Sequence, residues 1–499
     1  MVLMAHKIGR VAHPDKVMPS RLLLLMTLAL PSLPTMAAYW NITPNVSVSE
    51  RYSDNVNLAP AGRELSGFTT EINPGFSIAT RGAGRIKTSV DYSLRSPITF
   101  GQVQTTSRAY HQLNGTANAT LVDETFYMDA TARIGQQNLS LLGPLGTDTA
   151  DTSNIATYRT LSLSPYLRHR FGSFASADAR YTRDYTSYSN GGTSSTGDTF
   201  SLALNSGTSF NQLFWGLNYS KQKVGYTDQA VDREFDRGSA TLGYNLTPKF
   251  RVFATAGDER NTYPAAAGSS TGGSYWNAGF GITPTTNTSL EASYGQRFFG
   301  KTYTLKMSHR ARRTTWTADY LQDVVDARTY ILTPTTGIVI VTDPQTGLQR
   351  VLTDPATGKP LLFTFNIPTL ANDVYISKSF TASLGILTGK STVTLSVFDT
   401  NRESQLTAVN NSKQYGTNAA WGLKITGRTT STLSGGWSRL TTPGFDREDD
   451  LWNIRYSLTR QFNPKASGSL ELRHQQRSSN QAVGDYRENA ITGIANMTF

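Results

Sequence analysis

Apolar and polar residues alternate along most of the chain with a period of two. Leu213, Trp215, Leu217 and Tyr219 fall on one face of a short segment, and the residues of its other face include Gly, Asn and Ser. A β-strand places successive side chains on opposite faces, whereas a helix repeats at about 3.6 residues. The pattern therefore predicts β-strands with one apolar and one polar face. The same alternation recurs at 128–134, 240–246, 392–397 and 452–459.

Short and long connections alternate between the predicted strands. Strands of about ten residues with short turns at one end and long loops at the other are typical of outer-membrane β-barrels. We count about 22 strands over residues 38–499, and predict an all-β fold, a transmembrane antiparallel up-and-down β-barrel. The predicted short turns are 81–84, 171–173, 246–249, 282–287, 388–391 and 462–465. The long loops are 53–66, 139–153, 189–196, 263–272, 404–412, 442–448 and 477–484.

Two soluble all-β folds also have alternating strands. Propeller blades repeat at about 40–50 residues with shared motifs, and this chain has only loose Thr-Pro and Asn-Pro echoes. Tandem β-sandwiches would need linkers, and no Pro/Ser-rich linker is visible. An open stack of strands of this length would expose edges, which a closed barrel does not have. We therefore favour the barrel.

Residues 1–37 have the layout of an export signal. Basic residues precede the apolar run Leu22–Leu30, and small residues near Ala37 and Ala38 offer a cleavage site. The run is too short for a membrane-spanning helix. We predict a signal peptide over 1–37 and a barrel over 38–499. The first strand then starts almost at the cleavage site, so we expect no N-terminal plug domain.

Charge and composition exclude several classes of chemistry. The chain carries +11, and residues 1–37 hold four basic and one acidic residue, so residues 38–499 keep +8. Lys and Arg are scattered, with no run longer than that in Ala311–Arg313, so we expect no nucleic-acid partner. The absence of Cys excludes disulfides, thiolate metal sites and cysteine nucleophiles. The six histidines show no paired metal spacing, so we expect no metal, no cofactor and no enzyme, although a Ser–His–acid site assembled from distant strands stays open.

Charged residues occur within the predicted strands. On the lipid face, a cation near the bilayer midplane would cost roughly 2–4 kcal/mol. We therefore expect these residues to face the lumen, where they either brace the wall as ion pairs or line a polar conduit. Lys378, between Ile376 and Phe380, breaks the pattern, and either an interfacial position or a bulge fits it. The lumen-facing candidates are Asp129, Arg133, Asp178, Arg180, Arg455, Glu471 and Arg473.

The longest connection, residues 327–372, differs from the other loops. It repeats Asp-Pro-x-Thr-Gly, which is turn chemistry, and the apolar runs between these turns predict short strands. Strand parity places it at the external mouth. Natural barrels of about 22 strands are plugged, so we predict that this segment folds inward or caps the mouth. Arg328, Arg350 and Lys359 would then meet acidic groups on the wall or on a polysaccharide.

The end of the sequence reads as the strand that closes the barrel. A terminal aromatic after alternating apolar residues resembles the signal that outer-membrane proteins present to the barrel-assembly machinery. We expect this apolar face to serve assembly, and both the N- and C-termini to be periplasmic. The residues of the predicted signal are Ile491, Gly493, Ala495, Met497 and Phe499.

A family resemblance rests on the stretch Ser49–Leu58, which reads SERYSDNVNL. Its motif of Tyr52, Asp54, Asn55 and Val56 is similar to the start of porin-like β-barrels, and most similar to the outer-membrane barrel associated with PEP-CTERM and exopolysaccharide systems. Only this short motif is specific. The resemblance implies the outer membrane of a Gram-negative bacterium, a role with exopolysaccharide, and no catalytic residues. By themselves, Asp54 and Asn55 predict a tight turn where the first strand enters the first external loop.

Three functions fit this sequence. The leading hypothesis is a barrel that supports exopolysaccharide export or surface attachment in a PEP-CTERM-type system. The alternatives are a general diffusion porin with weak anion preference and an outer-membrane hydrolase. The expected partners are outer-membrane lipid and lipopolysaccharide, the barrel-assembly machinery, and a polysaccharide or export-complex proteins.

Overall fold

The computed structural model describes residues 39–499 with several internal gaps. The predicted signal peptide over 1–37 lies outside the described residues. The side chains of residues 333–372, including those of Arg350 and Lys359, also lie outside the described part of the chain. The gaps are 83, 146–153, 190–191, 230, 333–335, 339, 343–348, 352–361, 365–372 and 482–483.

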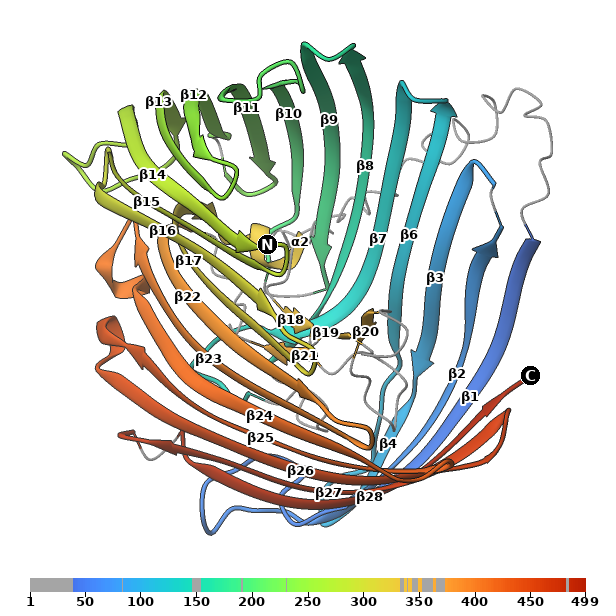
Figure 1. The fold of residues 1–499 in the computed structure, drawn as a ribbon. Coiled ribbons are helices and arrows are strands. Elements are labelled where there is room, and N and C mark those ends of the chain that lie inside the picture. The colour runs from blue at the N-terminus through green and yellow to red at the C-terminus, as the bar shows by residue number, and fades with distance from the viewer. Residues whose placement is uncertain are drawn as a thin grey trace, which may run out of the picture.

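The described strands form one closed antiparallel β-barrel (Figure 1). Its sheet has 24 strands, of which the short β4 and β5 extend two neighbouring positions, so 22 strands make the wall among the described residues. Along the wall each strand pairs with its neighbours in the chain, and β1 pairs with β28 from Asn45↔Thr498 to Ser53↔Ala490, which closes the ring. This confirms the predicted all-β up-and-down barrel.

The wall strands are β1 (Tyr39–Ser53), β2 (Gly67–Arg81), β3 (Ile86–Arg95), β6 (Tyr110–Val122), β7 (Phe126–Asn138), β8 (Ile155–Phe171), β9 (Ala175–Tyr188), β10 (Ser195–Ser206), β11 (Leu213–Tyr226), β12 (Arg233–Thr247), β13 (Phe250–Thr262), β14 (Gly273–Thr285), β15 (Thr288–Arg297), β16 (Gly300–Arg310), β17 (Thr314–Asp326), β22 (Val374–Leu387), β23 (Ser391–Ser404), β24 (Ser412–Thr426), β25 (Thr429–Thr442), β26 (Arg447–Asn463), β27 (Ala466–Ser479) and β28 (Tyr486–Thr498). The short strands β4 (Pro97–Gly101) and β5 (Thr106–Ser107) follow β3, and 3-10 helices lie at Ala408–Asn410 and Pro443–Phe445.

The wall is interrupted once where a proline enters it. β2 pairs first with β3 and then, across Ser96, with β4, which begins at Pro97. Proline has no backbone N–H to give to a ladder. The path therefore breaks at this point and resumes, and β4 continues the position that β3 began.

The distribution of side chains is the reverse of that in a soluble protein. Large apolar residues face outward, such as Trp276 at 47% and Trp452 at 50% exposure. Charged residues are buried on the inner side, such as Arg233 at 2% and Glu488 at 0%. An apolar outer band with a polar interior is what a lipid bilayer requires of a barrel. Among the described residues, no helix is long and apolar enough to cross a membrane.

The two ends of the barrel carry different connections. The turns β2–β3, β8–β9, β12–β13 and β26–β27 are short and share one end, which we call the short-turn end. Most connections at the opposite, long-loop end are longer, although only Phe298 and Phe299 join β15 to β16. Tyr39 pairs with Arg81 and the Phe499 N–H donates to the Pro44 carbonyl at 3.0 Å, so both described chain ends lie at the short-turn end.

The closing strand β28 keeps the alternation expected of it. Ile491, Met497 and Phe499 are exposed, at 43%, 46% and 61%, on the outward face. Gly493 and Ala495 share this exposed face, and Ile494 points the other way. The residues of the predicted assembly signal therefore form one outward row.

The connection between β17 and β22 lies at the long-loop end, as strand parity predicts. It begins with the single-turn helix α2 (Thr329–Leu332). Two small two-stranded sheets follow, which confirms the predicted short strands. In Figure 1 these elements are drawn within the ring of wall strands. Their strands are β18 (Thr336–Ile338) with β21 (Leu362–Thr364), and β19 (Ile340–Thr342) with β20 (Gln349–Val351).

Candidate functional site in the barrel lumen

Segment 327–332 is held at its base by a buried carboxylate. Asp326, the last residue of β17, accepts a hydrogen bond from the Tyr226 hydroxyl at 2.6 Å. It also accepts one from an Arg233 guanidinium nitrogen at 2.9 Å. Both Arg233 and Asp326 are almost completely buried. Because Tyr226 and Arg233 belong to β11 and β12, the end of β17 is fixed to a distant part of the wall.

The same segment reaches still further around the barrel through Arg328. Its guanidinium forms a buried ion pair with Asp184 on β9. The Leu332 carbonyl then accepts a hydrogen bond from Arg133 on β7 at 3.0 Å. Strand β17 lies far from β7 and β9 in the strand order of the wall, whereas β7 and β9 flank the same strand, β8. Segment 327–332 therefore crosses the lumen, which agrees with the predicted inward fold and with the prediction that Arg328 meets an acidic group on the wall.

Arg328 fits closely against the wall and keeps its charge there. A Cβ at Gly197, on β10, would collide with the Arg328 guanidinium, so a larger residue there would force that side chain to shift. Burial lowers the pKa of Arg328 to about 10. Arg328 is therefore still protonated at neutral pH and retains its charge opposite Asp184.

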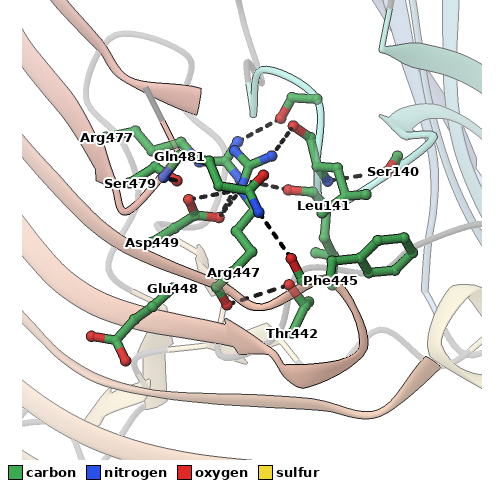
Figure 2. A network of polar contacts seen from close by, with 12 residues as sticks. Ser140, Leu141, Thr442, Phe445, Arg447, Glu448, Asp449, Arg477, Ser479 and Gln481 are labelled. Atoms are coloured by element: carbon green, nitrogen blue, oxygen red, sulfur yellow. Dashed lines mark hydrogen bonds and ion pairs between the residues drawn. The ribbon is translucent and has the colours of Figure 1, made fainter. Parts of the chain in front are cut away.

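A second segment docks inside the barrel from another side. In loop 139–145, between β7 and β8, the carbonyls of Leu141 and Gly143 accept hydrogen bonds from Arg477, both at 2.6 Å. The Leu142 carbonyl accepts one from Arg447 at 2.9 Å. Figure 2 shows these guanidinium groups converging on the loop from β26 and β27.

Asp449 holds the two arginines in position. Its carboxylate lies 3.0 Å from Arg447 and 2.5 Å from Arg477, and Arg477 and Asp449 are almost fully buried. A charge removed from water is stable only when it is paired and hydrogen-bonded. The carboxylate accepts hydrogen bonds from both guanidinium groups, and the loop carbonyls accept further hydrogen bonds from them. Docking of loop 139–145 is therefore coupled to the burial of these charges.

Asn154 holds loop 139–145 together from within. Its side chain accepts from the Ser140 N–H at 2.9 Å and donates to the Ser140 and Pro144 carbonyls, both at 2.9 Å. A side chain at Gly143 would collide with Asn154. The loop is thus a compact unit that presents a row of carbonyl oxygens.

The seven predicted lumen-facing charges all lie on strand faces opposite exposed apolar side chains. Their partners are now visible. Asp129 pairs with Arg180 at 2.8 Å, Asp178 with Arg168 at 3.2 Å, Arg455 with Glu471 at 3.5 Å, Arg473 with Glu488 at 3.0 Å, and Arg133 donates to the Leu332 carbonyl.

Sequence reasoning overlooked the residues that anchor the two docked segments to the wall. Asp184, Arg233, Arg447, Asp449 and Arg477 lie near strand ends at the long loops. Arg447 and Arg477 fall within the predicted long loops 442–448 and 477–484, and only the burial of these five residues in the structure reveals their role. The sequence did contain a signal, because Arg and Asp residues are frequent at these strand ends. Loop tips in water have no need for paired charges, so such a concentration indicates buried ion pairs.

Lys378 faces outward beside Glu403, with its Nζ 2.7 Å from a carboxylate oxygen. The register pairs Lys378 with Asn401 in a regular ladder. Lys378 therefore does not sit at a bulge, and the ion pair accommodates its charge near the long-loop end.

The motif of Tyr52, Asp54, Asn55 and Val56 lies at the seam where β1 meets β28. The Asp54 carboxylate accepts from the Asn489 N–H at 2.7 Å, which extends the closing pair beyond the strand end. The Asn55 side chain donates to the Ala59 and Arg487 carbonyls, both at 2.9 Å. Asn55 is fully buried and Val56 is 2% exposed, and Tyr52 faces outward beside Phe68. The motif joins the seam to the turn that begins the first long loop.

Replacing Asn55 by alanine is expected to weaken this seam. Two carbonyls would lose their donor and the Ala59 N–H its acceptor, with a loss of about 1–3 kcal/mol in the free energy of unfolding. Urea unfolding in vesicles, followed by tryptophan fluorescence, measures the effect. Asn41→Ala is the matched control, since Asn41 is exposed and its side chain contacts only Thr43 among the described residues. Equal stability of the two variants would contradict a clasp at Asn55.

No metal centre emerges from the described part of the chain, where no group of three or more His, Asp or Glu side chains could hold an ion. Each histidine described has a neighbour of another kind: Tyr92 for His111, Phe171 for His169, Thr288 for His309 and Asn489 for His474.

The fold and the inverted side-chain pattern define the protein as an outer-membrane β-barrel whose own segments cross its lumen. No family model matches the sequence, and no curated protein matches it. Solved structures similar to this chain include the siderophore receptor PirA from Pseudomonas aeruginosa, at 9% identity and a TM-score of 0.47, covering 93% of this chain and 81% of that one. The FrpB iron transporter from Neisseria meningitidis has 9% identity and a TM-score of 0.49, covering 92% and 81%. At these values the likeness concerns the fold and carries no argument about a ligand.

Proposed function

We propose that this barrel is a gated outer-membrane conduit that serves exopolysaccharide export or attachment. The observation that carries the proposal is the pair of docked segments. Segment 327–332 is held by the buried ion pairs of Arg328 and Asp326, and loop 139–145 is held by hydrogen bonds from Arg447 and Arg477 to its backbone carbonyls. A wide barrel that stood open would leak small molecules across the outer membrane. Segments of the barrel itself that dock and undock would allow passage of a polymer without a permanent leak.

The lumen wall is suited to a hydrated carbohydrate. Between the charged pairs, it presents Ser, Thr and Asn side chains, as in the contacts Ser164–Thr182, Thr241–Thr255 and Ser293–Thr304. Hydroxyl and amide groups can exchange hydrogen bonds with sugar hydroxyls. The resemblance of the Tyr52–Val56 motif to barrels of exopolysaccharide systems supports the same direction.

The two alternatives find less support. A general diffusion porin needs a lumen open at rest, whereas two segments cross this one. A Ser–His–acid hydrolase needs a histidine between a nucleophile and a carboxylate, and each histidine in the described part of the chain has a tyrosine, phenylalanine, threonine or asparagine rather than an Asp or Glu as its neighbour.

Deletion of the gene in the source bacterium tests the proposal. Surface and secreted polysaccharide are expected to fall by a large factor, and the intact gene supplied in trans is expected to restore them. Uptake of small sugars and antibiotics is the control readout, because loss of a diffusion porin would lower uptake while polysaccharide stayed constant. That second pattern would contradict the export role and favour the porin.

A further inference from the structure

The two ends of the barrel differ in how their charges are satisfied. At the long-loop end most buried charges are paired, as in Arg233–Asp326 and Arg297–Glu259. At the short-turn end many basic side chains are exposed and make no ion pair with any described residue. We call this set the basic rim, and its turn residues include Arg312, Arg313, Lys390, Arg428 and Lys465.

The carboxylates nearby do not neutralise the rim. Asp123 is already paired with Arg85 at 2.6 Å, and Asp178 with Arg168. Glu291 is paired with Arg251. Each of these three acids is matched by an arginine outside the rim, and Glu124 in the β6–β7 turn is exposed and makes no ion pair with a described residue. Against this one carboxylate, the five turn residues of the rim keep an excess of positive charge around the mouth.

The strand residues of the rim point into the lumen. Arg170 lies between His169 and the outward Phe171, which is 52% exposed, and Lys424 precedes the outward Ile425, which is 49% exposed. Arg310 lies three residues after the outward Met307 on β16, and therefore on the opposite face of that strand. Phospholipid headgroups approach a barrel from its outer face, where such residues do not point. The arrangement fits an anionic solute that enters the mouth.

We propose that the basic rim binds a polyanionic chain, an acidic polysaccharide bearing carboxylates, as it enters the lumen at the short-turn end. This inference rests on the proposed export function and adds the charge class of its substrate. Arginine forms paired hydrogen bonds with carboxylates, and a ring of positive charge attracts a polyanion from a distance. Binding releases counterions and therefore weakens as salt increases.

The test compares two variants of equal net charge in the full-length barrel. The rim variant carries Arg310→Gln, Arg312→Gln, Arg313→Gln and Arg428→Gln. The matched control carries Arg63→Gln, Arg108→Gln, Lys301→Gln and Arg487→Gln, which are exposed residues at the long-loop end. Heat-modifiable migration in gels confirms that each variant is folded, and Arg312→Gln with Arg313→Gln provides a milder rim variant.

The probe is a fluorescent oligogalacturonate, with a neutral maltooligosaccharide of equal length as comparison, in nanodiscs of zwitterionic lipid. The rim variant is expected to bind the acidic probe on the order of tenfold more weakly and with a shallower salt dependence. The control variant should bind it as the native protein does. Equal losses in both variants, or equal binding of the neutral probe, would overturn the proposal.

A further arm places the native barrel in nanodiscs containing phosphatidylglycerol. Competition of this lipid with the probe would assign the rim to lipid headgroups and overturn the proposal. Because polysaccharide levels in the deletion strain are measured separately, an export role could stand while this inference fails, with a neutral polymer as substrate.

Discussion

The Arg328→Ala variant is expected to conduct ions in steps several-fold larger than those of the native barrel. Removal of the guanidinium leaves Asp184 as an unpaired buried carboxylate beneath segment 327–332. Removing one partner of a buried ion pair is destabilising by about 3–5 kcal/mol. The wall does not depend on this contact, because its strands are held by their own ladders. The docked state of the segment therefore loses stability rather than the barrel.

Such a change shifts the docked equilibrium by roughly a hundred- to a few thousandfold, since about 1.4 kcal/mol corresponds to a factor of ten. Planar-bilayer recording measures the conductance. Arg63→Ala, which changes an exposed arginine of a long loop, should conduct as the native protein does.

Gly197→Ala probes the same contact sterically, because its Cβ would collide with Arg328. Gly385→Ala on β22, where nothing lies within 4 Å, is its control. Native-like conductance of both Arg328→Ala and Gly197→Ala would rule out a gate at this contact.

The second large effect is expected from Arg477→Met, which keeps the volume of the side chain and removes its charge. The Leu141 and Gly143 carbonyls would lose their donors and Asp449 its nearest cation. Each buried polar group left unsatisfied costs about 1–3 kcal/mol. Loop 139–145 should therefore leave the wall and expose its backbone.

Two measurements follow this release. Proteolysis of intact vesicles should cleave within 139–145 in the variant and not in the native protein, and cells should become more sensitive to a large antibiotic such as vancomycin. Arg487→Met is the control, since Arg487 is exposed and its side chain makes no ion pair with a described residue. A variant that resists protease and vancomycin as the native protein does would show that Arg477 does not hold the loop.

The architecture could be predicted because an up-and-down barrel is built from local relations. Consecutive strands are neighbours in space, so the alternation over Leu213–Tyr226 and the length of each turn specify both the strands and their order. The outward face was predictable for the same reason, since lipid selects the apolar side. The interruption at Ser96 and Pro97 was not predicted. There β2 stops pairing with β3 and begins pairing with β4, although β3 and β4 occupy the same position in the wall.

The candidate site could be predicted only in part, because its contacts join residues far apart in the chain. Arg328 was expected to meet an acidic wall residue, but 144 positions separate it from Asp184 and no local pattern selects that partner. Arg477 meets Leu141 across 336 positions. Even along the wall, Arg180 pairs with Asp129 rather than with Asp178 on its own strand. Strand pattern gives the face of a side chain, whereas its partner depends on register and on loops that fold inward.

Single-channel recording of the native barrel beside the double variant Arg328→Ala, Arg477→Met tests whether segments 327–332 and 139–145 close the lumen. We expect the native protein to be closed or to conduct only in small steps, and the double variant to show large, stable openings with native heat stability. A native barrel that already conducts in the same large steps as the double variant would contradict a lumen gated by segments 327–332 and 139–145.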